Sequence, residues 1–225
     1  MRAQKVAAWG EVARKLAHEI KNPLTPIQLS AQRIRKAHLK AAPDFDKVVT
    51  ECTVAIVQEV EALKNLVDEF AQFARLPAVH LAAADLGEVI EQALSLYDGL
   101  FGGVRIERRL APDLPMLRLD RDQMKRVLIN LVDNAIDATD KKGTVVISTE
   151  YDRVQGRVRL GVADDGPGIP AEDKDKLFVP HFSTKKRGSG LGLAIVSRIV
   201  QEHQGVVRVE DVAPRGARFV VELPA

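Results

Sequence analysis

His18 is followed directly by a carboxylate, Glu19, and four positions after the histidine comes a carboxamide, Asn22. If this segment is helical, residues three and four apart share one face, so Asn22 lies one turn away from His18 and Glu19. A glutamate beside an imidazole can orient the ring and accept its proton, and a carboxamide can position a water or a phosphoryl oxygen. The segment therefore predicts a nucleophilic histidine with two assisting side chains.

The same segment comes close to the His-Glu-x-x-His motif of zinc proteases. Position 22 is Asn22 instead of a second histidine, so the second metal ligand of that motif is missing and the zinc interpretation is excluded. A single histidine on a helix is most often a solvated surface residue. The interpretation of His18 therefore depends on residues elsewhere in the chain.

Far downstream, Asn130, Asn134 and Asp137 stand at i, i+4 and i+7, which places them on one face of a predicted helix. Neutral carboxamides can bind a magnesium ion whose other ligands are phosphates and water, without adding negative charge that would repel a nucleotide. The alternative is an ordinary solvated helix face.

Two glycine-containing segments follow. Asp164 comes directly after a predicted strand and can accept a hydrogen bond from an exocyclic amine, and Gly166 and Gly168 permit close backbone approach. Gly188-Ser189-Gly190-Leu191-Gly192 opens a helix, where free backbone donors and the helix dipole favour phosphate. This segment is not a P-loop because no Gly-Lys-Ser/Thr follows, and Leu193 stands where a dinucleotide fingerprint has glycine. Each segment alone could be a turn.

Together, in this order and spacing, the segments resemble the catalytic core of two-component sensor histidine kinases. The resemblance covers nearly the whole chain, and the residues within the motifs are most similar to those of NtrY-type nitrogen-regulation kinases. The corresponding motifs are the H box (Ala17 to Pro26), the N box (Asn130 to Ala138), the G1 box (Asp164 to Ile169), the F box (Leu177 to Phe182) and the G2 box (Gly188 to Gly192).

The resemblance implies a role for each matching position. His18 would be the phosphoacceptor, Glu19 its orienting base, and Asn22 a residue that orients water when a phosphorylated partner is dephosphorylated. ATP and Mg²⁺ would be the cofactors, with Asn134 as the metal-binding residue. Asp137 departs from the lysine or tyrosine that is common nearby in many sensor kinases. The residues implied in nucleotide binding are Asn130, Asn134, Asp137, Asp164, Gly166, Gly168, Phe178, Lys185, Gly188, Gly190, Leu191 and Gly192.

The histidine must be carried by a long helix. Apolar residues recur at steps of seven from Val6 to Ile34, which predicts a helix over residues 3–40 with a bend at Pro23 and Pro26. A break at residues 41–44 and a second amphipathic helix make an antiparallel hairpin. Because one hairpin cannot bury two apolar seams, we expect a homodimer that forms a four-helix bundle.

A linker around Pro77, expected to act as a hinge, separates residues 1–77, the dimerisation and phosphotransfer hairpin, from residues 78–225, the ATP-binding domain. Strands and helices then mix without regular alternation, which predicts an α+β class with an α/β sandwich of the GHKL (Bergerat) type that the family implies. The predicted helices cover residues 86–97, 122–139 and 193–203, and the predicted strands cover residues 104–110, 145–149, 158–163, 206–212 and 217–223.

Composition limits the function classes. The chain has 225 residues and a net charge of +2, from 33 basic and 31 acidic residues, so a nucleic-acid partner is not expected. The one cysteine, Cys52, fits a reduced cytoplasmic chain. No apolar run reaches the roughly 18 residues that span a bilayer. We expect a piece of a longer bacterial sensor, attached to the membrane only through segments outside this chain.

These features predict an enzyme that autophosphorylates His18 from Mg-ATP and passes the phosphoryl group to the receiver domain of a response regulator, with phosphatase activity toward that regulator. Two alternatives stay open. A GHKL-type ATPase would hydrolyse ATP directly, although Asn130 occupies the position where those hydrolases carry a water-activating glutamate. A catalytically silent dimer scaffold or phosphatase would keep the nucleotide only for regulation.

Overall fold

The computed structural model describes residues 2–74, 78–99, 102–180, 182 and 190–225, and it describes the side chains of the first helix from Ile20 onward. The chain divides into two compact units. One is helical and ends before Pro77, and the other is mixed and comprises residues 77–182 and 192–225. Within the described residues no helix is both long enough and apolar enough to span a membrane.

The helical unit is a hairpin of α1 (Arg2–Leu39) and α2 (Phe45–Ala74), as the heptad pattern predicts. α1 stays helical through Pro23 and Pro26. Near the turn, the two helices pack through a small core, and Arg33 pairs with Glu51 across the hairpin at 3.1 Å. This core consists of buried Ala37, Val48 and Cys52 with Ile34, Ala42 and Phe45 packed against it.

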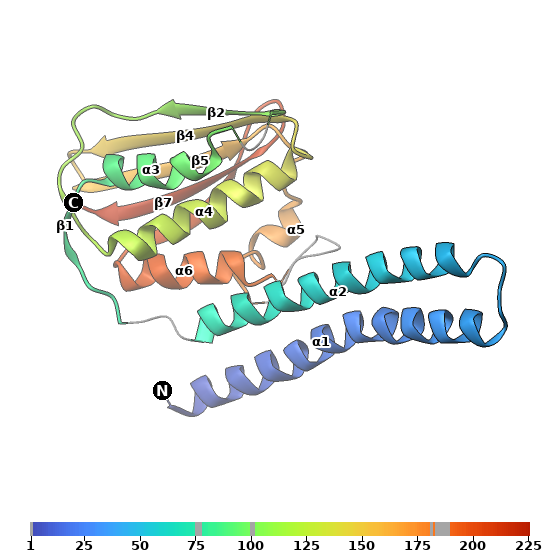
Figure 1. The fold of residues 1–225 in the computed structure, drawn as a ribbon. Coiled ribbons are helices and arrows are strands. Elements are labelled where there is room, and N and C mark those ends of the chain that lie inside the picture. Colours follow the sequence, from blue (N-terminus) through green and yellow to red (C-terminus); the bar gives the residue numbers. More distant parts are fainter. Residues whose placement is uncertain (1, 75–77, 100–101, 181, 183–189) are drawn as a thin grey trace. The chain divides into compact units, whose positions relative to one another are not determined.

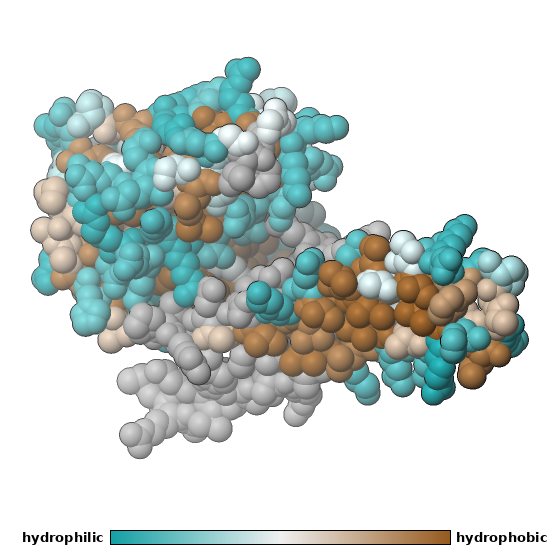
Figure 2. Space-filling model, in the orientation of Figure 1, coloured by the Kyte–Doolittle hydropathy of each residue, from teal (hydrophilic) through white to brown (hydrophobic). Residues whose placement is uncertain are grey.

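A second set of apolar side chains on the hairpin faces solvent in the single chain. Its members are between 46% and 59% exposed, and the exposed apolar surface lies along the described part of the hairpin (Figure 2). On α2 these residues are spaced by three or seven, so they follow one side of the helix. We call them the apolar stripe: Leu24, Leu29, Val54, Val57, Val60 and Val67.

The mixed unit is a two-layer α/β sandwich, which confirms the predicted fold class (Figure 1). Its main sheet has the order β2-β4-β5-β7-β6, in which β2 pairs with β4 in parallel and all other neighbours are antiparallel. Helices α3, α4 and α6 lie together on one face of the sheet (Figure 1). The strands are β2 (Val104–Arg109), β4 (Gly143–Asp152), β5 (Arg157–Asp164), β6 (Val206–Asp211) and β7 (Ala217–Pro224).

The helices of this layer begin where the sequence signals a start. Asp85 caps α3 (Leu86–Leu94) and Asp120 caps α4 (Arg121–Ala138), each by accepting hydrogen bonds from backbone N–H groups of the first turn. The third helix, α6, spans Gly192–Glu202. The apolar side of α4 faces the core because its hydrophobic residues recur with helical spacing. The fully buried residues of α4 include Met124, Val127, Leu128, Leu131 and Val132.

Three short elements were not predicted. β1 (Ala82–Ala84) and β3 (Leu117–Leu119) pair in a separate two-stranded sheet, and α5 (Ala171–Lys174) is a single turn. The predicted helix over residues 86–97 ends early as α3 and continues as the 3-10 helix η1 (Ser95–Tyr97). Segments of three or four residues are too short to show a period, so only their long-range contacts define them.

Candidate functional site

The predicted phosphoacceptor segment is helical. His18, Glu19 and Asn22 all lie within α1, so the spacing argument for a shared helix face holds for the backbone. Asn22 is exposed, and the side chains of His18 and Glu19 lie outside the described part of the structure. Proline at position 26 removes the N–H that would bond to the carbonyl of Asn22. The hydroxyl of Thr25 donates to the carbonyl of Lys21 at 3.4 Å within this stretch.

In the mixed unit, α4 brings the predicted carboxamides to one face. The Nδ2 of Asn130 donates to the carbonyl of Arg126 at 2.9 Å, which leans the side chain back along the helix. Its Oδ1 would lie 2.8 Å from a Cβ on Gly192, the first residue of α6. A larger residue at position 192 would therefore displace Asn130. The N box and the end of the G2 box, far apart in sequence, meet at this point.

Asp164 ends β5 in a buried position with a fixed carboxylate. Its Oδ1 accepts hydrogen bonds from the backbone N–H of Gly166 at 2.9 Å and from that of Ala217 at 3.4 Å. Burial raises the pKa of this carboxyl above its usual value, although the two backbone donors act in the opposite direction. Because Oδ1 holds the turn together, Oδ2 is the oxygen left to accept a hydrogen bond from a ligand.

The glycines around Asp164 are required by close contacts. A Cβ on Gly216, whose φ is +124°, would lie 2.0 Å from the carbonyl oxygen of Asp164, and a Cβ on Gly166 would lie 2.7 Å from the carbonyl oxygen of Ala138. Only glycine adopts the φ of Gly216 at no steric cost, and neither position has room for a Cβ. Asp164 is therefore held between the start of β7 and the C-terminal end of α4.

Gly168 and Phe178, two further predicted site residues, both contact residues at or near the start of β7. Gly168, at φ +81°, would place a Cβ 3.3 Å from the carbonyl oxygen of Gly216. Phe178 is half-buried, and its ring meets that of Phe219 on β7 edge to face, with centroids 6.3 Å apart. The G1 and F boxes therefore both rest on the chain that enters β7.

The remaining predicted residues are placed less completely. Asn134 is half-buried and Asp137 is exposed on α4, while Gly190 has φ +64° and Leu191 is buried. Lys185 and Gly188 lie outside the described residues. Within the part of the chain that is described, no group of three or more His, Cys, Asp and Glu side chains could hold a metal ion.

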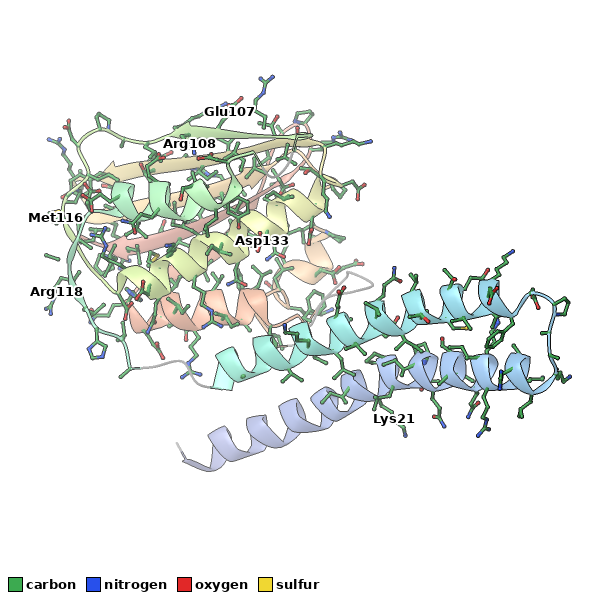
Figure 3. The ribbon with its side chains drawn as sticks, viewed as in Figure 1. Lys21, Glu107, Arg108, Met116, Arg118 and Asp133 are labelled. Atoms are coloured by element: carbon green, nitrogen blue, oxygen red, sulfur yellow. The ribbon has the colours of Figure 1, made fainter. Side chains whose placement is uncertain are left out.

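The sequence did not single out several residues that support this site. Tyr97 is buried and its hydroxyl donates to Asp133 at 2.7 Å, which attaches η1 to α4. Asp133 is labelled on that helix in Figure 3. Burial, and then the bond to Asp133, raises the pKa of Tyr97. Asp165 accepts from the N–H of Thr144 at 3.0 Å and so joins the end of β5 to the start of β4. Adjacent aspartates gave a weak signal for Asp165, but nothing local indicated Tyr97.

Two family models match the chain. The model of the His Kinase A (phospho-acceptor) domain matches residues 8–78, and the model of the histidine kinase-, DNA gyrase B-, and HSP90-like ATPase matches residues 119–225. The first match contains the segment of His18. The second contains Asn130, Asn134, Asp164 and Gly192.

Curated relatives match over nearly the full chain. The nitrogen regulation protein NtrY of Azorhizobium caulinodans is 36% identical over 95% of this chain and 28% of its own length. The sensor histidine kinase ZraS of Klebsiella oxytoca is 33% identical over 99% of this chain and 47% of its own length. The chain therefore spans between about a quarter and a half of the length of these relatives.

Solved structures agree with these matches. The catalytic domain of the histidine kinase ThkA is 35% identical, with a TM-score of 0.58 over 64% of this chain and 95% of that one. The histidine kinase ThkA in complex with the response regulator protein TrrA is 30% identical, with a TM-score of 0.79 over 100% of this chain and 64% of that one.

Proposed function

We propose that this chain, which belongs to the sensor histidine kinase family, transfers the terminal phosphoryl group of ATP to His18 and then to an aspartate of a response-regulator receiver domain. Residues 1–77 would form the dimerisation and phosphotransfer part, and residues 78–225 the ATP-binding part. The observation that most supports the proposal is the buried carboxylate of Asp164, fixed by two backbone donors beside the carboxamide-bearing helix α4.

The nucleotide would lie along α4. Asp164, which ends β5 beside the C-terminal end of α4, would accept a hydrogen bond from the exocyclic amine of adenine. Asn130, with Lys185, would lie near the phosphates, because Asn130 is two turns before Ala138 and touches the start of α6 at Gly192. Backbone N–H groups at the start of α6 would favour phosphate there.

Asn134 would hold Mg²⁺ through its carboxamide oxygen. A single neutral oxygen ligand fits an ion that takes its other ligands from phosphates and water, and the described residues offer no acidic cluster that would bind the ion alone. When bound, the ion would neutralise charge on the phosphates. Phosphoryl transfer depends mainly on such neutralisation and on alignment.

In the transfer step, a ring nitrogen of His18 attacks the terminal phosphorus of ATP. The new P–N bond forms as the bond between this phosphorus and the bridging oxygen breaks, and ADP leaves with that electron pair. Glu19 accepts the proton that the imidazole loses. A receiver aspartate then attacks the same phosphorus and regenerates His18. In the phosphatase reaction, Asn22 would orient a water that hydrolyses the aspartyl phosphate of the phosphorylated regulator and releases inorganic phosphate.

Incubation with ATP labelled at the terminal phosphate, in the presence of magnesium, tests this proposal. We expect label on the protein that is stable to base and labile to acid, as a phosphorus–nitrogen bond on histidine requires. Release of free phosphate without labelled protein would indicate a GHKL-type ATPase. Neither product would indicate the silent scaffold. Asn130, in place of a water-activating glutamate, favours transfer over direct hydrolysis.

The response regulator is proposed as partner because the whole chain matches a kinase that has been solved with such a regulator. We propose a cytoplasmic location, with any membrane attachment made by segments outside this chain. No nucleic-acid partner is proposed.

The apolar stripe supports a homodimer. Burying its half-exposed side chains in a dimer interface would stabilise the dimer by about 25 cal/mol for each Å² of apolar surface removed from water. A second copy of the hairpin offers a matching surface. Val57→Glu is expected to weaken dimerisation by more than about 100-fold, because each dimer would bury two new carboxylates. Sedimentation over a range of concentrations measures the change. The matched control, Val154→Glu, alters a 97% exposed valine in the mixed unit. A Val57→Glu dimer as tight as the control would contradict the proposed interface.

A further inference from the structure

Asp120 lies where three segments of the mixed unit meet. Its Oδ2 accepts a hydrogen bond from the backbone N–H of His80 at 3.0 Å, and its Oδ1 accepts one from the N–H of Gln123 at 3.1 Å. Its own N–H donates to Nε2 of His203 at 3.0 Å. One residue therefore holds the chain that enters from the Pro77 linker, the N-terminal end of α4 and the segment that follows α6.

The histidine in this arrangement is fixed on both sides. His203 is only 3% exposed, and its Nδ1 lies 2.8 Å from the carbonyl oxygen of Ile199. Because Nε2 accepts from Asp120, the ring proton belongs on Nδ1, where it can be donated to Ile199. Burial alone would raise the pKa of the Asp120 carboxyl, but the backbone donors of His80, Gln123 and Asp122, together with the nearby His203, outweigh it, so the pKa lies below its usual value. The carboxylate is therefore ionised near neutral pH and accepts at both oxygens.

α4 and α6 would also carry the proposed nucleotide site, at a second point where they meet. α4 and the chain of α6 meet once at Asp120 and His203 and again at Asn130 and Gly192. These two contacts fix the helices against sliding along each other. His80 is therefore tied, through one carboxylate, to the rigid frame that holds Asn130 and Asn134.

The tie also sets the length of the chain between the two units. Six residues lead from Ala74, the last residue of α2, to His80, so they span at most about 22 Å. Without the bond to Asp120, the next fixed point would be Ala82, which pairs with Leu119 in the β1–β3 sheet. The tether would then gain two residues, or up to about 7 Å. A longer tether lowers the effective concentration of one tethered group near another.

We propose that Asp120 is a positioning residue for phosphoryl transfer, which fixes the point where the linker leaves the ATP-binding unit and so sets that unit's reach toward His18. This inference rests on the function proposed above. Asp120 contacts neither reacting group and acts through the backbone of His80. The effect falls on the rate of transfer and leaves nucleotide binding unchanged, because the bond to His80 lies at the far end of α4 from Asp164.

Two variants remove the same hydrogen bond by different routes. Asp120→Asn keeps one oxygen to cap α4, since asparagine caps helices as well as aspartate does, but its amide group cannot accept from His80. His80→Pro removes the N–H donor and leaves Asp120 unchanged. The matched controls are Asp122→Asn, which removes one negative charge from the same turn, and His80→Ala, which keeps the backbone donor.

In the full chain, we expect both variants to label His18 about 1.5- to 2-fold more slowly at saturating ATP, because effective concentration falls roughly as the −3/2 power of tether length when six residues become eight, and we expect an unchanged affinity for ATP. Both controls should label at the original rate. Unchanged rates in Asp120→Asn and His80→Pro would overturn the inference. So would a loss of ATP affinity that matched the loss of rate, because Asp120 would then act only on the fold of α4. Absence of label on the unmodified chain would overturn the proposed function, and this inference with it.

Discussion

Replacement of His18 by glutamine is expected to reduce labelling from ATP to the background level. The reaction needs a lone pair on a ring nitrogen, and a carboxamide nitrogen has none available because it is delocalised into the carbonyl group. Glutamine keeps a polar side chain and the helical backbone of α1, in which His18 lies. The change should therefore remove the nucleophile with little effect on the hairpin. Acid-labile, base-stable label on the purified variant and on the unmodified chain is the measurement.

A second histidine on the same helix provides the control. His38 lies near the end of α1, and its ring meets that of Phe45 with centroids 5.5 Å apart. His38→Gln should keep full labelling, and calorimetry should give the same ATP affinity for both variants, because Asp164 and Asn130 lie in the other unit. Label that persists in His18→Gln would refute the assignment of the phosphoacceptor. Loss of label in both variants would point to damage to the hairpin.

The sequence predicted the parts of this site that depend on local periodicity. The positions of Asn130 and Asn134 on one face follow from helical spacing alone. The long helices were predicted to within a few residues for the same reason. Gly192 was singled out as a helix start, but its contact with Asn130 depends on how α6 packs on α4.

What could not be predicted depends on residues far apart in the chain. Gly216 supports Asp164 from 52 positions away, and His203 accepts from Asp120 across 83 positions. Such contacts exist only once the sheet order places β7 beside β5 and α6 beside α4. β1 and β3 were not predicted for a related reason, because a segment of three residues shows no alternation and only the pairing of the two segments makes them strands.

The second large effect is expected at Asp164, where asparagine should reverse part of the preference for adenine. The carboxylate Oδ1 is occupied by Gly166 and Ala217, so an asparagine that keeps these bonds presents an NH₂ group to the ligand. That group is a donor and cannot pair with the exocyclic amine of adenine. Loss of a hydrogen bond to a charged group costs about 1.5–3 kcal/mol, so ATP should bind about 10- to 150-fold more weakly.

Inosine triphosphate makes the test specific, because it has a carbonyl oxygen where adenosine triphosphate has the amine. Asp164→Asn should bind the inosine nucleotide at least as well as the unmodified chain does. A general loss of stability would weaken both nucleotides equally. Asp165→Asn is the matched control, since Asp165 is the neighbouring carboxylate and bonds instead to the backbone of Thr144. Calorimetry with both nucleotides, in the presence of magnesium, measures the ratio of affinities.

The preference for ATP over inosine triphosphate should depend on pH in the unmodified chain but not in Asp164→Asn. Because burial raises the pKa of Asp164, this carboxyl becomes protonated at a higher pH than an exposed aspartate does as the solution is acidified. Protonation removes the negative acceptor, so the preference for ATP over the inosine nucleotide should decline as the pH falls through that raised pKa. Asparagine does not titrate, so the ratio in Asp164→Asn should stay flat over the same range. An equal pH dependence in both proteins would mean that Asp164 does not contact the base.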